Sequence, residues 1–201
     1  MTVFSEGAFA MLGMYWSDVS GLKKLDRALS RLDGKSIRKI GSRALNRAGG
    51  AGREKTRIAL KGQTGLTPAT IRRFLKVKRA TYNRLEYRIN GRGGDISLKY
   101  FDAEERRKGV RAKPFGQRRI FAGTFIKGGK FPNRVSIGLG GHVFARTGAG
   151  RSPIEKQKSG VILPREVLKG ESARAWQATV AKVLPSRVIH EIKRETGKVF
   201  S

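Results

Sequence analysis

Apolar residues recur at helical spacing near the start of the chain. Four leucines after Ser20 follow one another at steps of three or four residues, which predicts a helix with a single apolar stripe. The pair Asp33-Gly34 is typical of a stop and should end this helix. The leucines of the stripe are Leu22, Leu25, Leu29 and Leu32.

A second helix is predicted over residues 35–60, where small and apolar residues again share one face. Residues 49–52 read Gly-Gly-Ala-Gly, and each glycine inside a helix costs roughly 1 kcal/mol relative to alanine. Two interpretations stay open: the helix breaks at this run, or the small residues let another backbone approach closely. The predicted apolar face contains Ile37, Ile40, Ala44 and Ala48.

Two further helices are predicted from capping and spacing. Thr67 and Pro68 combine an N-cap residue with a proline at the first helical position, so a short helix should run to Leu75. A C-terminal helix should begin near Ser172, and Pro185 should kink or restart it because proline has no N–H to donate. Its apolar side should comprise Ala175, Trp176, Val180, Val183, Val188, Ile189 and Ile192.

The middle of the chain alternates apolar and polar residues, as strands do. Residues 85–90 and 96–100 alternate on either side of a glycine-rich turn, which predicts a β-hairpin. Helices first, strands in the middle and a helix last predict an α+β fold with a central antiparallel sheet and long basic, glycine-rich loops. Further strand-like segments are 119–126, 135–139, 142–146 and 159–164.

We expect one α+β domain over residues 19–201, preceded by an apolar arm over residues 1–18. The arm contains no lysine or arginine but holds all three methionines of the chain. It either forms a strand or helix packed on its own domain or docks onto a neighbouring subunit, since methionine and aromatic residues suit such surfaces. The docking candidates are Phe4, Phe9, Met11, Leu12, Met14, Tyr15 and Trp16.

Charge adds the strongest compositional fact. Lysine and arginine number 44 against 15 acids, so the formal net charge is +29. Such a chain attracts polyanions and should bind nucleic acid non-specifically at low salt, or it meets an acidic neighbour in a larger assembly. The most apolar stretch, residues 7–16, is shorter than the ~20 residues that cross a bilayer, and the N-terminus has no signal-peptide pattern. We therefore expect a soluble protein made inside the cell.

Positive charge is densest over residues 103–134, which carry ten basic residues and two acids. Outside 119–126 this stretch should form extended loops. A basic helix such as residues 35–57 could also lie against phosphates and give affinity without sequence specificity. The alternative for each run of charged residues is a solvent-exposed surface that contacts no partner. The candidates for contact with DNA or an acidic partner are Arg106, Arg107, Lys108, Arg111, Lys113, Arg118 and Arg119.

Catalytic and metal-binding patterns are not found. The chain has no cysteine, which excludes disulfides, thiolate metal sites and a cysteine nucleophile. His142 and His190 fall in different elements, whereas a metal needs three or four converging ligands. Asp102, Glu104 and Glu105 are the densest acids, but the cations beside them indicate local charge compensation rather than a two-metal site.

Glycine-rich segments do not match nucleotide-binding loops. Residues 123–130 superficially resemble a phosphate loop, but Gly129 stands where the lysine should follow Gly128. Residues 138–150 lack the spacing of a dinucleotide fingerprint, and no Gly-x-Ser-x-Gly occurs. We expect these glycines to serve turns, and we expect no enzyme activity, no cofactor and no small-molecule substrate.

An ordered series of segments characterises the chain between about residues 21 and 194. They are GLKKLD at 21–26, ALNRA at 44–48, the turn and helix at 67–75, the basic middle, IFAGTFI at 120–126, HVFAR at 142–146, VILP at 161–164 and LPSRVIH at 184–190. In order and character this series resembles the minor tail protein Z family of long-tailed bacteriophages, also called tail completion proteins. Residues 1–18 fall outside the resemblance.

The resemblance implies a structural virion protein of the neck, at the head-proximal end of the tail. Such a protein is made in the host cytoplasm and acts when the finished tail joins the DNA-filled head, as a homo-oligomeric ring of six copies. Its implied partners are the tail terminator and head-tail connector proteins and the genome end in the channel, with no membrane and no catalytic residues to carry over. The alternative is a non-specific DNA-binding protein, such as a packaging or nucleoid factor.

Overall fold

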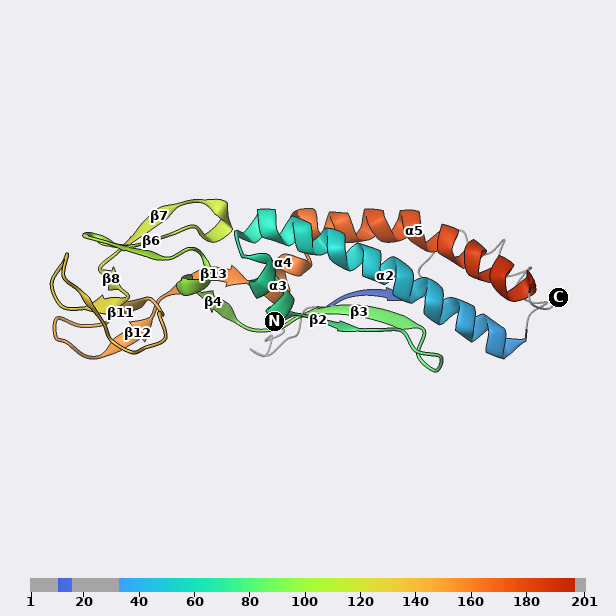
Figure 1. Cartoon of the computed structure of the whole chain (residues 1–201), viewed down its shortest axis with the longest axis horizontal. Helices are drawn as coiled ribbons and strands as arrows, with labels where there is room; N and C mark the ends of the chain where they lie inside the picture. The colour runs from blue at the N-terminus through green and yellow to red at the C-terminus, as the bar shows by residue number, and fades with distance from the viewer. Residues whose placement is uncertain (1–10, 16–32, 198–201) are drawn as a thin grey trace, which may run out of the picture.

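The chain is α+β, as predicted, and elongated. The computed structural model describes residues 11–15 and 33–197. Figure 1 shows two long helices side by side along one half of the molecule, a small sheet beneath them, and a β-rich lobe that forms the other end. The predicted helix after Ser20 lies outside the described residues.

Helices α2 (Gly34–Thr64) and α5 (Gly170–Gly197) run antiparallel and form the spine of the body. Lys39 Nζ lies 2.8 Å from Glu195 Oε1 near one end of the pair. At the other end the Gln63 side chain accepts a hydrogen bond from the backbone N–H of Ser172 over 3.2 Å. With 31 residues, α2 is about 46 Å long at 1.5 Å per residue, which accounts for the extended shape.

Asp33-Gly34 begins a helix instead of ending one, so the predicted stop is wrong. The Asp33 carboxylate accepts a hydrogen bond from the Ser36 backbone N–H over 3.0 Å, the geometry of an N-cap. Hydrogen bonding from the side chain and then from the backbone N–H of Ser36 lowers the pKa of Asp33, with a further contribution from Lys35. Aspartate followed by glycine suits a turn and a helix start equally well, and the spacing did not separate them.

The glycine run at 49–52 does not break α2. A Cβ on Gly49 would overlap the ring of Tyr87, and one on Gly52 would lie 2.8 Å from the ring of Trp176. Tyr87 and Trp176 stack on each other with ring centroids 6.1 Å apart. The small residues therefore admit two aromatic side chains, not the second backbone of the open interpretation.

The remaining helices follow the predicted signals in part. Helix α3 (Pro68–Phe74) has Thr67 as its N-cap, as expected, and a short helix α4 (Leu163–Val167) begins where a buried strand was expected to end. Helix α5 continues through Pro185 without restarting, and the kink stays a prediction. Pro185 lies on the exposed side of α5, where water can satisfy the carbonyl that proline leaves unbonded. Ile189 is exposed as well, so its place on the apolar side was wrong.

The body sheet consists of β1 (Met11–Tyr15), β3 (Glu86–Gly91) and β2 (Leu75–Lys78), with β3 in the centre. Both neighbours are antiparallel to β3, and Leu12 lies opposite Ile89. The predicted hairpin is wrong: β4 (Asp95–Ser97) pairs with β13 (Lys158–Ile162), not with β3. Because β1 and β2 occupy both edges of β3, no edge remains for β4.

Residues 104–156, which we call the basic β lobe, contain three small antiparallel sheets. Most of residues 103–134 were expected as loops, but short strands cover much of them. The orders are β5-β6-β7, β12-β11-β8 and β10-β9. The strands are β5 (Glu104–Arg106), β6 (Gly109–Ala112), β7 (Arg119–Ala122), β8 (Thr124–Phe125), β9 (Lys127–Gly128), β10 (Val135–Ser136), β11 (Phe144–Arg146) and β12 (Ile154–Lys156).

The lobe is attached to the body at three places. The chain leaves through β4 and the 3-10 turn η2 (Leu98–Tyr100) and returns through β13, so the two crossings pair with each other. A second 3-10 turn, η3 (Pro114–Gly116), lies against the end of α2. There Gly65 adopts φ 76°, and a Cβ on it would lie 2.6 Å from the carbonyl oxygen of Lys113.

One core runs through the body and into the base of the lobe. Its largest fully buried side chains include Tyr87 and Phe101, the latter where the chain enters the lobe. None of the helices in the described ranges carries an apolar stretch of membrane-spanning length.

Candidate functional site in the basic β lobe

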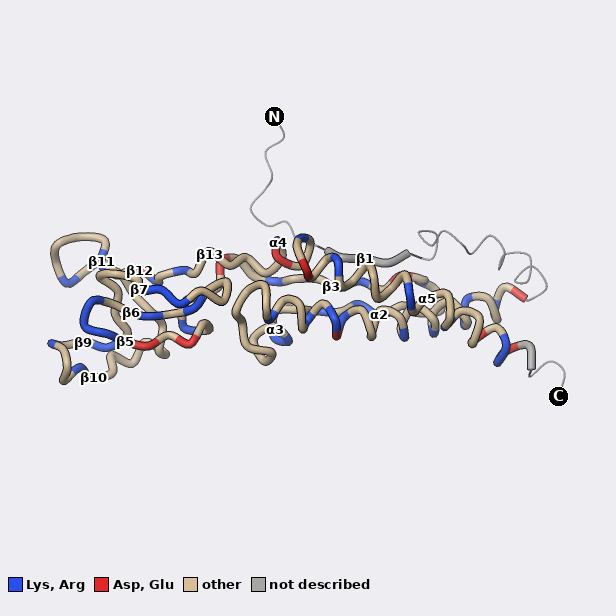
Figure 2. Tube along the Cα trace, turned by 90° about the horizontal axis from the view of Figure 1, so that it is seen from above, with Lys and Arg blue, Asp and Glu red and all other residues tan. Residues whose placement is uncertain are grey.

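The basic β lobe concentrates positive charge on a small scaffold. Residues 104–156 contain 13 lysine and arginine residues and three acids. Figure 2 shows blue segments along several strands and turns of this end of the molecule. Few of its side chains are fully buried (Val110, Ala112, Val143 and Phe144 among them), so most of the cations lie on the surface.

Two of the predicted contact residues are engaged by one acid. Glu104 on β5 lies opposite Arg111 on β6 and pairs with it, while Arg106 donates to the same carboxylate over 2.6 Å. Hydrogen bonds from Arg111 and Arg106 lower the pKa of Glu104, so this carboxylate stays ionised. The strand register brings these three residues together.

Two more predicted residues converge on Asp102. Lys113 Nζ lies 3.1 Å from Asp102 Oδ2, and Arg118 lies 3.4 Å from the same oxygen. The hydrogen bond from Lys113 is the largest cause of the lowered pKa of Asp102. Because these pairs are exposed to solvent, each contributes little to stability.

The other three predicted residues have no acidic partner in the described part of the chain. Arg107 and Lys108 form the turn between β5 and β6, and within the described residues neither side chain makes an ion pair or hydrogen bond. Arg119 places its guanidinium 4.9 Å from the centre of the Phe121 ring, a cation–π contact. The predicted cluster therefore divides into four compensated cations and three that lack a counter-charge.

Three further cations were not among the predicted contact residues, although two of them, Lys127 and Arg134, lie in the basic stretch of residues 103–134. Lys127, Arg134 and Arg146 line a pocket together with Arg107 and Lys108. Only the pairing of β8 with β11 and of β9 with β10 brings them to the same place, and no local spacing indicates it.

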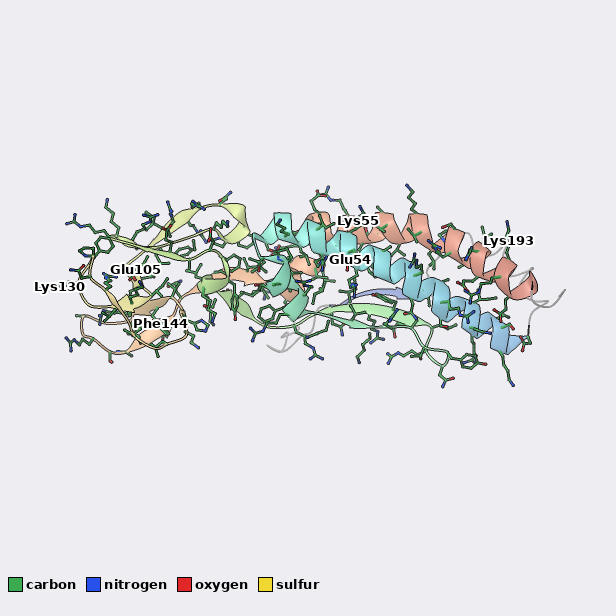
Figure 3. The ribbon with its side chains drawn as sticks, viewed as in Figure 1. Glu54, Lys55, Glu105, Lys130, Phe144 and Lys193 are labelled. Carbon is green, nitrogen blue, oxygen red and sulfur yellow. The ribbon has the colours of Figure 1, made fainter. Side chains whose placement is uncertain are left out.

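Glu105 fixes one wall of this pocket. Its carboxylate pairs with Arg134 and accepts the backbone N–H groups of Ile126 over 3.3 Å and of Lys127 over 3.2 Å. Figure 3 shows Glu105 within the lobe and Lys130 at its far end. Asp102, Glu104 and Glu105 thus each serve a separate set of donors, as expected for charge compensation.

The predicted arm is described only in part. Residues 11–15, which include Met11, Leu12, Met14 and Tyr15, form β1 and pair with the chain's own β3. This backbone pairing agrees with the interpretation of the arm as a strand on its own domain. Phe4, Phe9 and Trp16 lie outside the described residues.

The basic helix at residues 35–57 carries its own counter-charges. Lys39 and Arg43 pair with Glu195, and Arg43 also lies 3.6 Å from Glu191. Arg57 pairs with Glu54 on the same helix over 2.6 Å. These pairs hold α2 to α5 or lie within α2, and among the described residues they compensate four of the eight cations of residues 35–57. In the lobe five of the 13 cations have such a pair, so the lobe presents the less compensated surface.

The two histidines lie in different parts of the molecule. His142 is half-buried at the base of the lobe, with Nδ1 2.9 Å from Ser97 Oγ, and His190 is exposed on α5. Over the described ranges no group of three or more histidine, aspartate or glutamate residues is arranged to hold a metal ion. Comparison of the chain with family models, curated proteins and solved structures finds no match.

Proposed function

We propose that the chain is a structural protein of a tailed bacteriophage, a tail completion component of the neck that helps join the tail to the DNA-filled head. The observation that carries the proposal is the basic lobe at the end of an elongated helical body. A body with long helical sides suits lateral contacts between copies in a ring, and a charged end suits axial contact with an acidic neighbour. The ordered resemblance to tail completion proteins supplies the particular assembly.

The lobe surface has the composition of a contact surface. Among the described residues nine large apolar side chains are exposed, and five of them lie in the lobe. Apolar side chains between positive charges are typical of surfaces that a partner covers. The five are Phe115, Ile120, Phe131, Val135 and Leu139.

A non-specific DNA-binding role is the second candidate. It is favoured by the cations that have no acidic partner among the described residues, Arg107 and Lys108 above all, because cations that bind a phosphate backbone release its counterions. Salt-dependent DNA binding by the purified chain fits both roles and does not separate them.

Deletion of the gene in the virus that encodes the chain tests the tail role. We expect complete heads and complete tails to accumulate unjoined, and electron microscopy of wild-type particles to place the chain at the neck. Restoring the gene in trans should restore joined particles. If purified particles lack the protein, the tail role is wrong; if deletion instead leaves heads empty of DNA, a packaging factor is the better description.

A further inference from the structure

Five cations from four segments converge on a single pocket of about 190 Å³ in the lobe. Arg107 and Lys108 come from the turn between β5 and β6, and Lys127 comes from β9. Arg134 precedes β10, and Arg146 ends β11. No aspartate or glutamate of the described residues lines the pocket, and Glu105 pairs with only one of the five cations, Arg134, so the pocket carries a net positive charge.

Two of these cations are held in place by the fold. Arg134 is fixed by Glu105, yet its Nε has no hydrogen-bond partner among the residues that the structure describes. Arg146 donates through Nη1 to the carbonyl oxygens of Gly150 over 3.2 Å and Arg151 over 2.9 Å, and it lies 5.2 Å from the centre of the Phe125 ring. Groups positioned in advance lose less entropy when a ligand arrives.

The other three cations keep their donors available. Within the described residues the side chains of Arg107, Lys108 and Lys127 make no ion pair and no hydrogen bond, and all three are exposed. Bringing like charges together without a counter-charge is unfavourable, and an anion in the pocket would relieve that repulsion. The pocket therefore combines two cations that the fold holds in place with three exposed cations that can donate hydrogen bonds to an anion.

Glycines let a ligand come close to the backbone at the rim. Gly123 adopts φ 69°, and a Cβ built on it would meet no atom within 4 Å. Gly129 adopts φ 92°. Other residues would be strained at these positive φ angles, which glycine adopts readily.

We propose that this pocket binds a phosphate group, either as free phosphate or as part of a nucleic-acid strand. Donors that approach from several segments match a tetrahedral group with several oxygens better than a planar carboxylate with two, and arginine and lysine are the residues that bind phosphate. The inference does not depend on the tail role, because it concerns the isolated chain.

Binding by the purified full chain tests the proposal. Calorimetry measures the affinity for inorganic phosphate, and fluorescence anisotropy measures the affinity for a short single-stranded oligonucleotide, both at one ionic strength. The pocket variant combines R107Q, K108Q and K127Q. The matched control combines R106Q, K113Q and R118Q, which removes the same charge from the same lobe but alters only cations paired with Glu104 or Asp102.

We expect the pocket variant to lose affinity by about tenfold or more for at least one probe, and the control to lose less than about threefold. Loss for phosphate alone identifies free phosphate, and loss for the oligonucleotide alone identifies the nucleic-acid strand. Equal losses in both variants overturn the proposal, because general charge then explains binding. Stronger binding of a poly-glutamate peptide than of either probe overturns it as well. If the triple variant does not fold, R107Q compared with R106Q gives the same decision.

Discussion

Adjacent glycines in α2 have opposite surroundings. A Cβ on Gly49 overlaps the Tyr87 ring, whereas a Cβ on Gly50 meets no atom within 4 Å. We expect G49A to lower the free energy of unfolding by about 1–3 kcal/mol, because overpacking forces the ring to move. We expect G50A to raise it by up to about 1 kcal/mol, because alanine favours the helix. Urea denaturation measures both, and an equal loss in the two variants would contradict this account.

His142 should make stability depend on pH. Burial lowers the pKa of His142 below its ordinary value of 6.5, and Lys99 and Lys156 lower it further. The unfolded chain therefore takes up the proton first as pH falls. The contribution of His142 to stability is complete above its unfolded pKa and is lost as pH falls through the folded pKa.

The free energy of unfolding should decline as pH falls from above to below the ordinary histidine pKa of 6.5, and H142N should make that decline shallower. Urea denaturation at several pH values in this range is the measurement. H190N, at an exposed position, is the control and should leave the contribution of His142 in place. An identical decline in wild type and H142N would remove His142 as a cause.

At the scale of elements, Trp176 connects α5 to the rest of the body. It is 3% exposed, stacks on Tyr87 and covers Gly52. We expect W176A to lower the free energy of unfolding by about 3–5 kcal/mol. Q177A, at the exposed neighbouring position, should change it by less than about 0.5 kcal/mol. Chemical denaturation distinguishes these outcomes, and a small effect of W176A would mean that the stack contributes little.

The helices could be predicted from sequence because their signals are local. Spacing indicated α2 and α5, and Thr67-Pro68 indicated α3, since caps and apolar stripes lie within a few residues of one another. Strand pairing is not local. Nothing near β4 indicates that both edges of β3 are occupied, so the hairpin was wrong.

For the candidate site, the sequence predicted the local charge density but not the pairing of the charges. Charge density identified the cations of residues 103–134, but not which of them have acidic partners. The β5–β6 register places Arg111 opposite Glu104, and tertiary folding brings Arg146 to the pocket of Arg107. Composition therefore identified the charged surface, and only the structure divided it into paired cations and a pocket.

At the scale of the whole molecule, the net charge of +29 should oppose self-assembly. Copies of the chain repel one another until a counter-charged partner is present, most strongly at low salt where screening is weak. We expect the isolated protein to remain unassembled at low salt and to form rings once an acidic partner is added. Mass photometry across a salt series measures the assembly state. Stable rings of the isolated protein at low salt would show that charge repulsion does not prevent self-assembly.

The three attachments of the lobe determine how a force applied to its tip would travel. A lobe connected through one segment could rotate about it. Here β4, β13 and the turn at η3 all connect the lobe to the body, and η3 lies directly against the end of α2. A pull on the charged tip is shared among the three attachments and passes along the helix pair. If a partner bound to the lobe moved, the far end of the helix pair would then move with it.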